Sequence, residues 1–297
     1  MPSLMIPKRG DAAVALGAVL CLALIAALPA AAQGTPPKQS TQQQQPQQAG
    51  QAQPQGNAQN PTASQQPPVT KEEEDAYKAF NSLPAEPSAP IISQGQEFLS
   101  KYPKSIFRPV IFARLTLTFL NARQVDQMFS TADKALVEDP DNLDVLALMS
   151  TTIPVAGYDP RALDADQKLL LAEKYAKRVI ELAPKMTKPL NMTDEDFAKS
   201  INVKLGMAHS GLGRVYFRQG KTSDSVNELG QSVKADPSPD ALDYYLLGDG
   251  QMRLKDYPDA FAAFESCGKS PWAWQDRCKQ LAQDAKKLAA APPAAKP

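Results

Sequence analysis

The sequence predicts an all-α fold, namely a right-handed α-α superhelical solenoid of about five helix pairs that ends in a C-terminal capping helix. Two observations support this prediction. Apolar side chains recur at three- and four-residue spacings from Lys71 to Leu288, which is the period of amphipathic helices. In addition, one residue pattern occurs twice between Gly206 and Pro271, offset by about one repeat length. A single helix pair buries only part of its apolar surface, so successive pairs must stack.

The two copies of this pattern carry similar residues at similar steps. The first copy consists of His209, Leu212, Gly213, Tyr216, Gly220, Ser225, Leu229 and Pro237. The second copy consists of Tyr244, Leu247, Gly248, Gln251, Ala260, Phe264 and Pro271. This spacing resembles the tetratricopeptide repeat, a helix–turn–helix unit of about 34 residues with the signature W-x2-L-G-x2-Y, then A-x3-F, then P. The segment Phe98–Ser105 is similar to the end of a degenerate repeat in exported bacterial envelope proteins of this family.

Residues 1–32 are predicted to form a secretory signal peptide. Two basic residues precede an apolar run, and small residues end at Ala32, after which we expect cleavage. The protein is therefore expected to be exported, as a periplasmic or envelope-associated protein. The alternative is an inner-membrane anchor through residues 12–32, because the apolar run approaches the roughly 20 residues that span a bilayer.

Two further segments are expected to be disordered. Residues 33–70 are rich in Gln and Pro and contain almost no large aliphatic side chains, so they cannot bury enough apolar surface to offset the entropy of ordering. Residues 289–297 form an Ala/Pro tail. The solenoid is thereby assigned to residues 71–288.

Apolar spacing and prolines place the first three helix pairs. The first pair begins at Lys71 with an acidic first turn, and its second helix covers residues 89–102. The second pair ends at Pro140 and the third at Pro184. Between the helices of the third pair, residues 154–166 contain prolines and a glycine, which break helices, so this segment is predicted to be a surface loop.

The fourth pair is predicted to begin with an unusually long helix. Thr193 is a suitable N-cap with Asp196 three residues later, and helical spacing continues to Gly220. This helix of roughly 26 residues would be about 39 Å long. After the fifth pair, residues 272–288 are predicted to form a terminal helix whose outer side is polar, as the open end of a solenoid requires.

Two glycines are predicted to mark close helix crossings. Gly213 and Gly248 hold the same position in the two copies, where the absence of a side chain lets two antiparallel helices approach. Small residues are expected on the facing helices, at Ala172, Ser225 and Ala260.

The chain contains no recognisable catalytic or metal-binding pattern. The formal net charge is zero, with 32 basic and 32 acidic residues, which argues against a nucleic-acid-binding surface. His209 is the only histidine, so a multi-histidine metal site is excluded, and its repeat position predicts a packing role. Acidic residues are spread along helix faces without an acid–base pair. We therefore expect no catalytic residues, no cofactor and no metal, and a protein that is not an enzyme.

Two cysteines lie near the end of the predicted solenoid. Cys267 and Cys278 fall on consecutive helices across a short connection, and an exported protein would allow a disulfide between them. The alternative is two small buried thiols that fill the contact between the helices.

The resemblance to tetratricopeptide proteins implies a set of partner-binding residues, since the first helix of each pair lines the concave groove in that family. The matching positions are Arg214, Phe217, Arg218, Tyr245, Asp249, Met252 and Arg253. Arginine and aromatic side chains at such positions would hold an extended or helical peptide. The set by which some family members clamp a chaperone's C-terminal carboxylate is not reproduced, because Ser210 and Arg214 occupy two of its positions.

Two functional hypotheses follow. The first is a non-enzymatic scaffold of the bacterial cell envelope that binds a partner protein or peptide in the concave groove. The second is an envelope protein that processes a glycan or a small molecule, with its site in the insert at residues 154–166 or at 185–200. Self-association is a further option, and membrane contact is expected only if the N-terminal segment is uncleaved.

Overall fold

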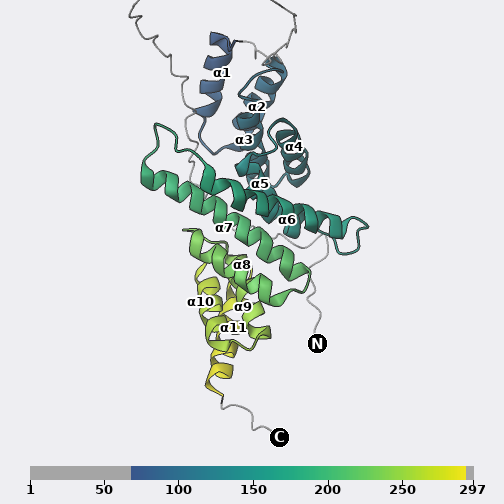
Figure 1. The fold of residues 1–297 in the computed structure, drawn as a ribbon, viewed down its shortest axis with the longest axis vertical. Coiled ribbons are helices and arrows are strands. Elements are labelled where there is room, and N and C mark those ends of the chain that lie inside the picture. The colour runs from purple at the N-terminus through teal and green to yellow at the C-terminus, as the bar shows by residue number, and fades with distance from the viewer. Residues whose placement is uncertain (1–67, 292–297) are drawn as a thin grey trace, which may run out of the picture.

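The computed structural model describes residues 68–291, and these residues form helices and connections without a strand (Figure 1). The α-helices are α1 (Lys71–Asn81), α2 (Ser88–Lys101), α3 (Arg108–Asn121), α4 (Val125–Glu138), α5 (Leu143–Thr152), α6 (Ala165–Leu182), α7 (Asp194–Arg218), α8 (Thr222–Ala235), α9 (Ala241–Arg253), α10 (Tyr257–Lys269) and α11 (Gln275–Ala290). A π-helical turn, η1 (Ile153–Gly157), follows α5, and a 3-10 turn, η2 (Ala183–Lys185), follows α6.

Each helix packs against its neighbours in the chain. Within residues 68–291, the pairs α1–α2, α3–α4, α5–α6, α7–α8 and α9–α10 succeed one another, and α11 packs on α10. Figure 1 shows α1 to α4 at one end of an elongated molecule, α6 and α7 across its middle, and α8 to α11 at the other end. The predicted all-α solenoid is therefore confirmed.

The N-terminal predictions concern residues that the structure mostly leaves undescribed. The signal segment 1–32, and with it the alternative anchor at 12–32, lies outside the described residues, as does nearly all of the linker 33–70. Among residues 68–291, no helix combines the length and the apolar character that a membrane crossing requires.

The buried apolar side chains form three clusters along the solenoid. One cluster is formed by residues of the helices α1 to α6, with Val215 of α7. A second lies between α5, α6 and α7, and a third holds α8 to α11 together. Helix α7 contributes Ala208 and Leu212 to the middle cluster, while its Gly213 lies against Leu229 of the last one. Helix α7 is thus the element that joins the two halves of the solenoid.

The start of α7 agrees with its prediction. The side-chain oxygen of Thr193 accepts a hydrogen bond from the backbone N–H of Asp196 at 3.1 Å and donates one to its carboxylate at 2.8 Å. Three acidic residues follow in the first turn, where they face the positive end of the helix dipole. The helix has 25 residues and projects beyond its neighbours in Figure 1.

The segment 154–166 differs from the predicted surface loop. Pro154 is buried, and residues 153–157 continue α5 as a π-helical turn. Proline has no backbone N–H, so the regular hydrogen-bond ladder of α5 cannot continue through it, and a wider turn follows. Gly157 lies against Phe129 of α4, because a Cβ atom there would come within 2.9 Å of the Phe129 ring. Most of the exposed residues lie in the second part of the segment, and Leu163 is fully exposed.

The C-terminal boundary also differs from the prediction. Helix α11 begins at Gln275 rather than at Trp272, and it includes Ala289 and Ala290, which were assigned to a disordered tail. Trp272 and Trp274 lie in the turn before α11, where the carbonyl of Trp272 accepts a hydrogen bond from the N–H of Gln275 at 3.1 Å.

The two predicted helix crossings are present. A Cβ atom on Gly213 would lie 2.5 Å from the Leu229 side chain, and one on Gly248 would lie 2.8 Å from the Phe264 ring. The hydroxyl of Ser225 donates a hydrogen bond to the carbonyl of Gly213 at 2.8 Å, which ties α8 to α7 at this crossing. Ala172 and Ala260 are fully buried.

Replacing Gly213 with alanine is expected to destabilise the protein. The added methyl group would clash with Leu229, and overpacking of this kind lowers the free energy of unfolding by about 1–3 kcal/mol. Gly230→Ala is the matched control, because a Cβ atom at Gly230 of α8 meets no atom within 4 Å. Alanine there should raise the free energy of unfolding by about 0.5–1 kcal/mol. Urea denaturation of both variants measures the difference, and equal effects would contradict the proposed crossing.

Cys267 of α10 and Cys278 of α11 form a disulfide in the structure. Their Cα atoms are 5.7 Å apart, within the range that a disulfide spans, and both residues are fully buried. The bond joins the capping helix to the last helix pair.

Reduction of this disulfide is expected to lower the free energy of unfolding by roughly 2–3 kcal/mol, because the bond restricts the unfolded chain. Urea denaturation with and without a reductant measures the effect. The double variant Cys267→Ala/Cys278→Ala is the control, since reductant should leave its stability unchanged. Labelling of both thiols in the native, unreduced protein would contradict the disulfide.

Candidate functional site

The seven predicted partner-binding residues lie on α7 and α9, but only some of them are accessible. Phe217 and Met252 are partly buried and Arg253 is exposed. The guanidinium of Arg253 lies over the Phe217 ring, 5.3 Å from its centroid, and donates a hydrogen bond to the Asp249 carboxylate at 2.8 Å. The structure therefore brings these four residues together across the first helices of the last two pairs.

Arg214 is not a surface residue, which corrects its prediction. It is 7% exposed, and its guanidinium forms ion pairs at 2.8 Å with Asp240 and with Asp243 of α9. A third hydrogen bond runs at 3.3 Å to the carbonyl of Thr151 in α5. The Arg214 side chain is buried among contacts with neighbouring helices, so it is not accessible to a partner.

Asp243 is the centre of this buried polar network. One carboxylate oxygen accepts a hydrogen bond from Ser210 of α7 at 2.9 Å, and the other accepts one from Ser232 of α8 at 3.1 Å. Burial raises the pKa of Asp243, and Arg214 opposes that rise. Burial alone would lower the pKa of Arg214, but the carboxylates of Asp243 and Asp240 outweigh it and raise that pKa. The network satisfies both charges and joins α5, α7, α8 and α9.

Arg218, another predicted partner-binding residue, makes contacts within the protein. Its Nε donates a hydrogen bond to the carbonyl of Pro154 at 3.1 Å, and its guanidinium lies 5.3 Å from the centroid of the Tyr158 ring. Burial lowers the pKa of Arg218. Carbonyl groups at the end of a helix lack partners within it, and basic side chains commonly supply them. Arg218 and Arg214 thus hold the irregular end of α5 against α7.

Tyr245 is the second predicted residue that is buried, at 6% exposure. Its ring packs edge-on against Trp272 and Trp274, with centroid distances of 6.2 Å and 4.9 Å. Burial raises the pKa of the Tyr245 hydroxyl. Tyr245 therefore packs against the two tryptophans and offers little surface of its own to a partner.

Trp272 and Trp274, in the turn between α10 and α11, are further functional candidates. Both are only partly buried, and their ring centroids are 5.9 Å apart. They pack against the same cluster as the residues of α7 and α9 above. We call this combined surface the aromatic–arginine face. It consists of Phe217, Met252, Arg253, Trp272 and Trp274.

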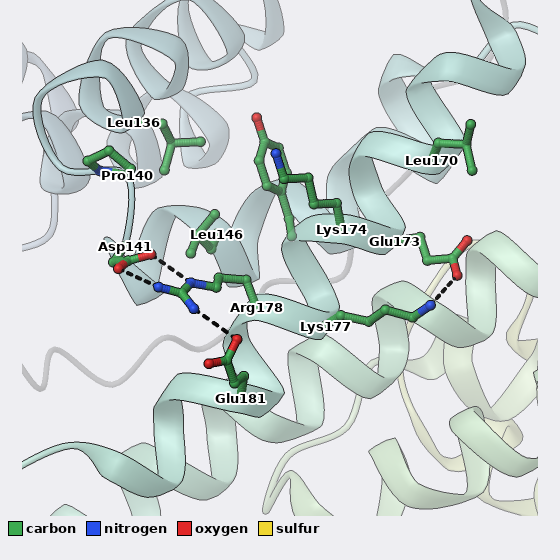
Figure 2. Close-up of a pocket in the computed structure, with 11 residues that line it drawn as sticks. Leu136, Pro140, Asp141, Leu146, Leu170, Glu173, Lys174, Lys177, Arg178 and Glu181 are labelled. Carbon is green, nitrogen blue, oxygen red and sulfur yellow. Dashed lines mark hydrogen bonds and ion pairs between the residues drawn. The ribbon is translucent and has the colours of Figure 1, made fainter.

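A second hollowed surface lies on the other helices of the solenoid. A groove of about 740 Å³ runs between α4 and α6, and Leu146 of α5 lines it as well (Figure 2). Figure 2 shows Arg178 reaching from α6 to Asp141 in the connection between α4 and α5. Sequence reasoning missed this groove, because its width depends on the distance between two helices that are far apart in the chain.

The remaining candidate positions show no sign of chemistry. His209 of α7 faces α8, where its Nδ1 lies 2.7 Å from a Glu228 carboxylate oxygen. The side chain thus contributes to the contact between these two helices. In the first insert, Asp159, Asp164 and Asp166 are exposed, and most of the second insert beyond Thr193 belongs to α7. Within residues 68–291, no group of three or more His, Cys, Asp or Glu side chains is arranged to hold a metal ion.

Comparisons with known proteins leave the family open. No protein-family model matches the chain, and no curated protein matches it. A solved structure of a tetratricopeptide repeat protein from Parabacteroides merdae shares 13% sequence identity over 71% of this chain and 99% of that chain, with a TM-score of 0.24. A TM-score this low carries no argument about fold or function.

Removal of the Arg214 guanidinium is expected to be strongly destabilising. Arg214→Met leaves the Asp243 carboxylate buried without its counter-charge, which should lower the free energy of unfolding by about 3–5 kcal/mol. Arg253→Met is the matched control on α9, and its exposed side chain should contribute within about 0.5 kcal/mol. Chemical denaturation compares the two.

The double variant Arg214→Met/Asp243→Leu removes both charges and should recover much of the lost stability, because an apolar pair of similar size costs no desolvation of charge. A loss from Arg214→Met no larger than the loss from Arg253→Met would show that the buried pair does not hold the helices together.

Proposed function

We propose that this chain is a non-enzymatic protein-interaction scaffold of the bacterial cell envelope, and that the aromatic–arginine face binds a segment of a partner protein or peptide. The observation that carries the proposal is a set of contacts around α9, in which Arg253 lies over the Phe217 ring, and Trp272 and Trp274 pack together against Tyr245. Met252 of the same helix is partly exposed and packs against the same apolar cluster as Phe217 and the tryptophans. Tryptophan and arginine are the residue types that most often dominate binding energy at protein interfaces.

The face is fixed before any partner arrives. Arg253 is held by the Phe217 ring on one side and the Asp249 carboxylate on the other, while Tyr245 packs against both tryptophans. The disulfide fixes the start of α11 to α10. Side chains that are already ordered lose less entropy on binding, so such a surface binds more tightly than a mobile one.

The location in the envelope is supported by the sequence and by the disulfide. Residues 1–32 have the layout of a secretory signal, and disulfides persist in oxidising compartments such as the bacterial periplasm. The segment 33–70 would then act as a spacer between the N-terminal end and the solenoid. An anchor through residues 12–32 would leave the same solenoid on the outer side of the inner membrane.

The double variant Met252→Glu/Arg253→Glu is expected to abolish partner binding without unfolding the protein. Both residues reach the surface, and two acidic side chains would remove the apolar contact and reverse the charge of the face. Affinity capture with the full chain from an envelope fraction of the encoding organism, quantified by mass spectrometry, should show at least a tenfold loss of the specific partners, about 1.4 kcal/mol or more.

Lys234→Glu is the matched control for this experiment, because Lys234 is an exposed lysine of α8 outside the face. Its partner set should equal that of the unmodified chain, and circular dichroism should show all variants folded. If Met252→Glu/Arg253→Glu captures the same proteins in the same amounts, the aromatic–arginine face is not the binding surface.

A further inference from the structure

We propose that the groove between α4 and α6 is a second docking site, which takes a peptide segment with a large apolar side chain close to an acidic one. This site is separate from the aromatic–arginine face, since its lining residues come from α4, α5, α6 and the connection between α4 and α5. The inference therefore goes beyond the function proposed above and does not depend on it.

Several of the side chains that line the groove are apolar or aromatic. Leu136 of α4, Leu146 of α5 and Leu170 of α6 line it, together with Tyr175 (Figure 2). Leu146 is 2% exposed and is part of the core, whereas Leu170 is 60% exposed. A leucine this exposed beside a hollow offers apolar area that water covers poorly. A leucine, methionine or phenylalanine side chain of a partner would gain free energy by covering it.

The charges around the groove are paired within the protein except for one lysine. The guanidinium of Arg178 donates hydrogen bonds to both oxygens of Asp141, at 2.7 and 2.6 Å, and one to Glu181 at 2.8 Å. Lys177 donates one to Glu173 at 2.6 Å. All three acidic side chains that line the groove are therefore already engaged with a basic one.

Lys174 is the basic side chain that remains. It is exposed, it lines the groove, and it forms no ion pair or side-chain hydrogen bond with any residue from 68 to 291. In Figure 2 it extends from α6 between Leu136 and Leu170. An ammonium group beside an apolar surface is complementary to a carboxylate that follows or precedes an apolar side chain, and such complementarity selects among partners.

The groove is also held at a fixed width. The two parallel hydrogen bonds from Arg178 to Asp141 join α6 to the connection between α4 and α5, next to Pro140. Paired hydrogen bonds of this type set both distance and orientation. Because the groove is open to solvent rather than closed around its contents, it suits part of a longer chain better than an enclosed small molecule.

The test uses the full chain and a phage-displayed library of random peptides as the probe. Selection should enrich peptides that share a large apolar residue near Asp or Glu. Lys174→Glu should weaken the binding of the enriched peptides by at least about tenfold, because a charge-assisted contact becomes a repulsion. Leu170→Ala should weaken it by about threefold or more, since it removes exposed apolar area.

Two matched controls keep this result specific to the groove. Lys234→Glu makes the same charge change on α8, and Leu254→Ala removes a leucine that is 46% exposed at the end of α9. Neither should alter peptide affinity, and Met252→Glu/Arg253→Glu should not alter it either. All six substituted residues reach solvent, so the variants are expected to fold, and circular dichroism checks that they do.

A charge exchange completes the experiment. An enriched peptide in which the acidic residue is replaced by Lys should bind Lys174→Glu better than it binds the unmodified chain. Recovery of no peptides would overturn the proposal, and so would peptides whose affinity is insensitive to both Lys174→Glu and Leu170→Ala. Peptides that lose binding only with Met252→Glu/Arg253→Glu would also overturn it, while supporting the aromatic–arginine face.

Discussion

The buried pair of Arg214 and Asp243 is the interaction on which the continuity of this solenoid depends. Apolar clusters fill the space on both sides of α7, and between them α9 is joined to α7 by an ion pair. Removing two charges from water is costly unless each finds its counter-charge and enough hydrogen bonds. Those bonds come from Asp240, Ser210, Ser232 and the carbonyl of Thr151. Several helices must therefore be in place together. The network therefore specifies how α9 sits on α7, beyond what apolar packing alone would require.

Basic residues are used in the same way at the two candidate surfaces, the aromatic–arginine face and the groove between α4 and α6. Arg214 and Arg218 form contacts that hold α5 and α9 to α7. The accessible surface of α7 and α9 therefore presents Arg253 and aromatic rings instead. On α6 the arrangement is the same, because Arg178 is paired with Asp141, whereas Lys174 lines the groove without an ion pair among residues 68–291. In both places a paired basic residue sets the geometry and an accessible one gives the surface its charge. A scaffold with two such surfaces would hold two partner segments at a fixed separation.

Features that depend on local sequence could be predicted, and features that depend on the next repeat could not. Thr193, Gly213 and Gly248 were identified because a cap and a helix crossing require particular residue types at particular steps. Arg214 and Tyr245 were misassigned to the surface, because their burial depends on α9 and on the tryptophans before α11. One repeat position did indicate that a basic residue such as Arg214 would be buried. Asp243 occupies the position of buried Ala208 in the preceding copy, and an acidic residue at a buried repeat position requires a basic partner nearby.

Native-state hydrogen exchange of Arg214→Met, compared with the unmodified chain, tests the role of the buried pair most directly. The amides of α5, α7 and α9 should all lose protection in this variant, because the network joins these helices across the junction. The amides of α3 and α4, which the network does not touch, should keep theirs at moderate denaturant. Loss of protection confined to the turn around Arg214, with α5 and α9 unchanged, would contradict the claim that this ion pair couples the two halves of the solenoid.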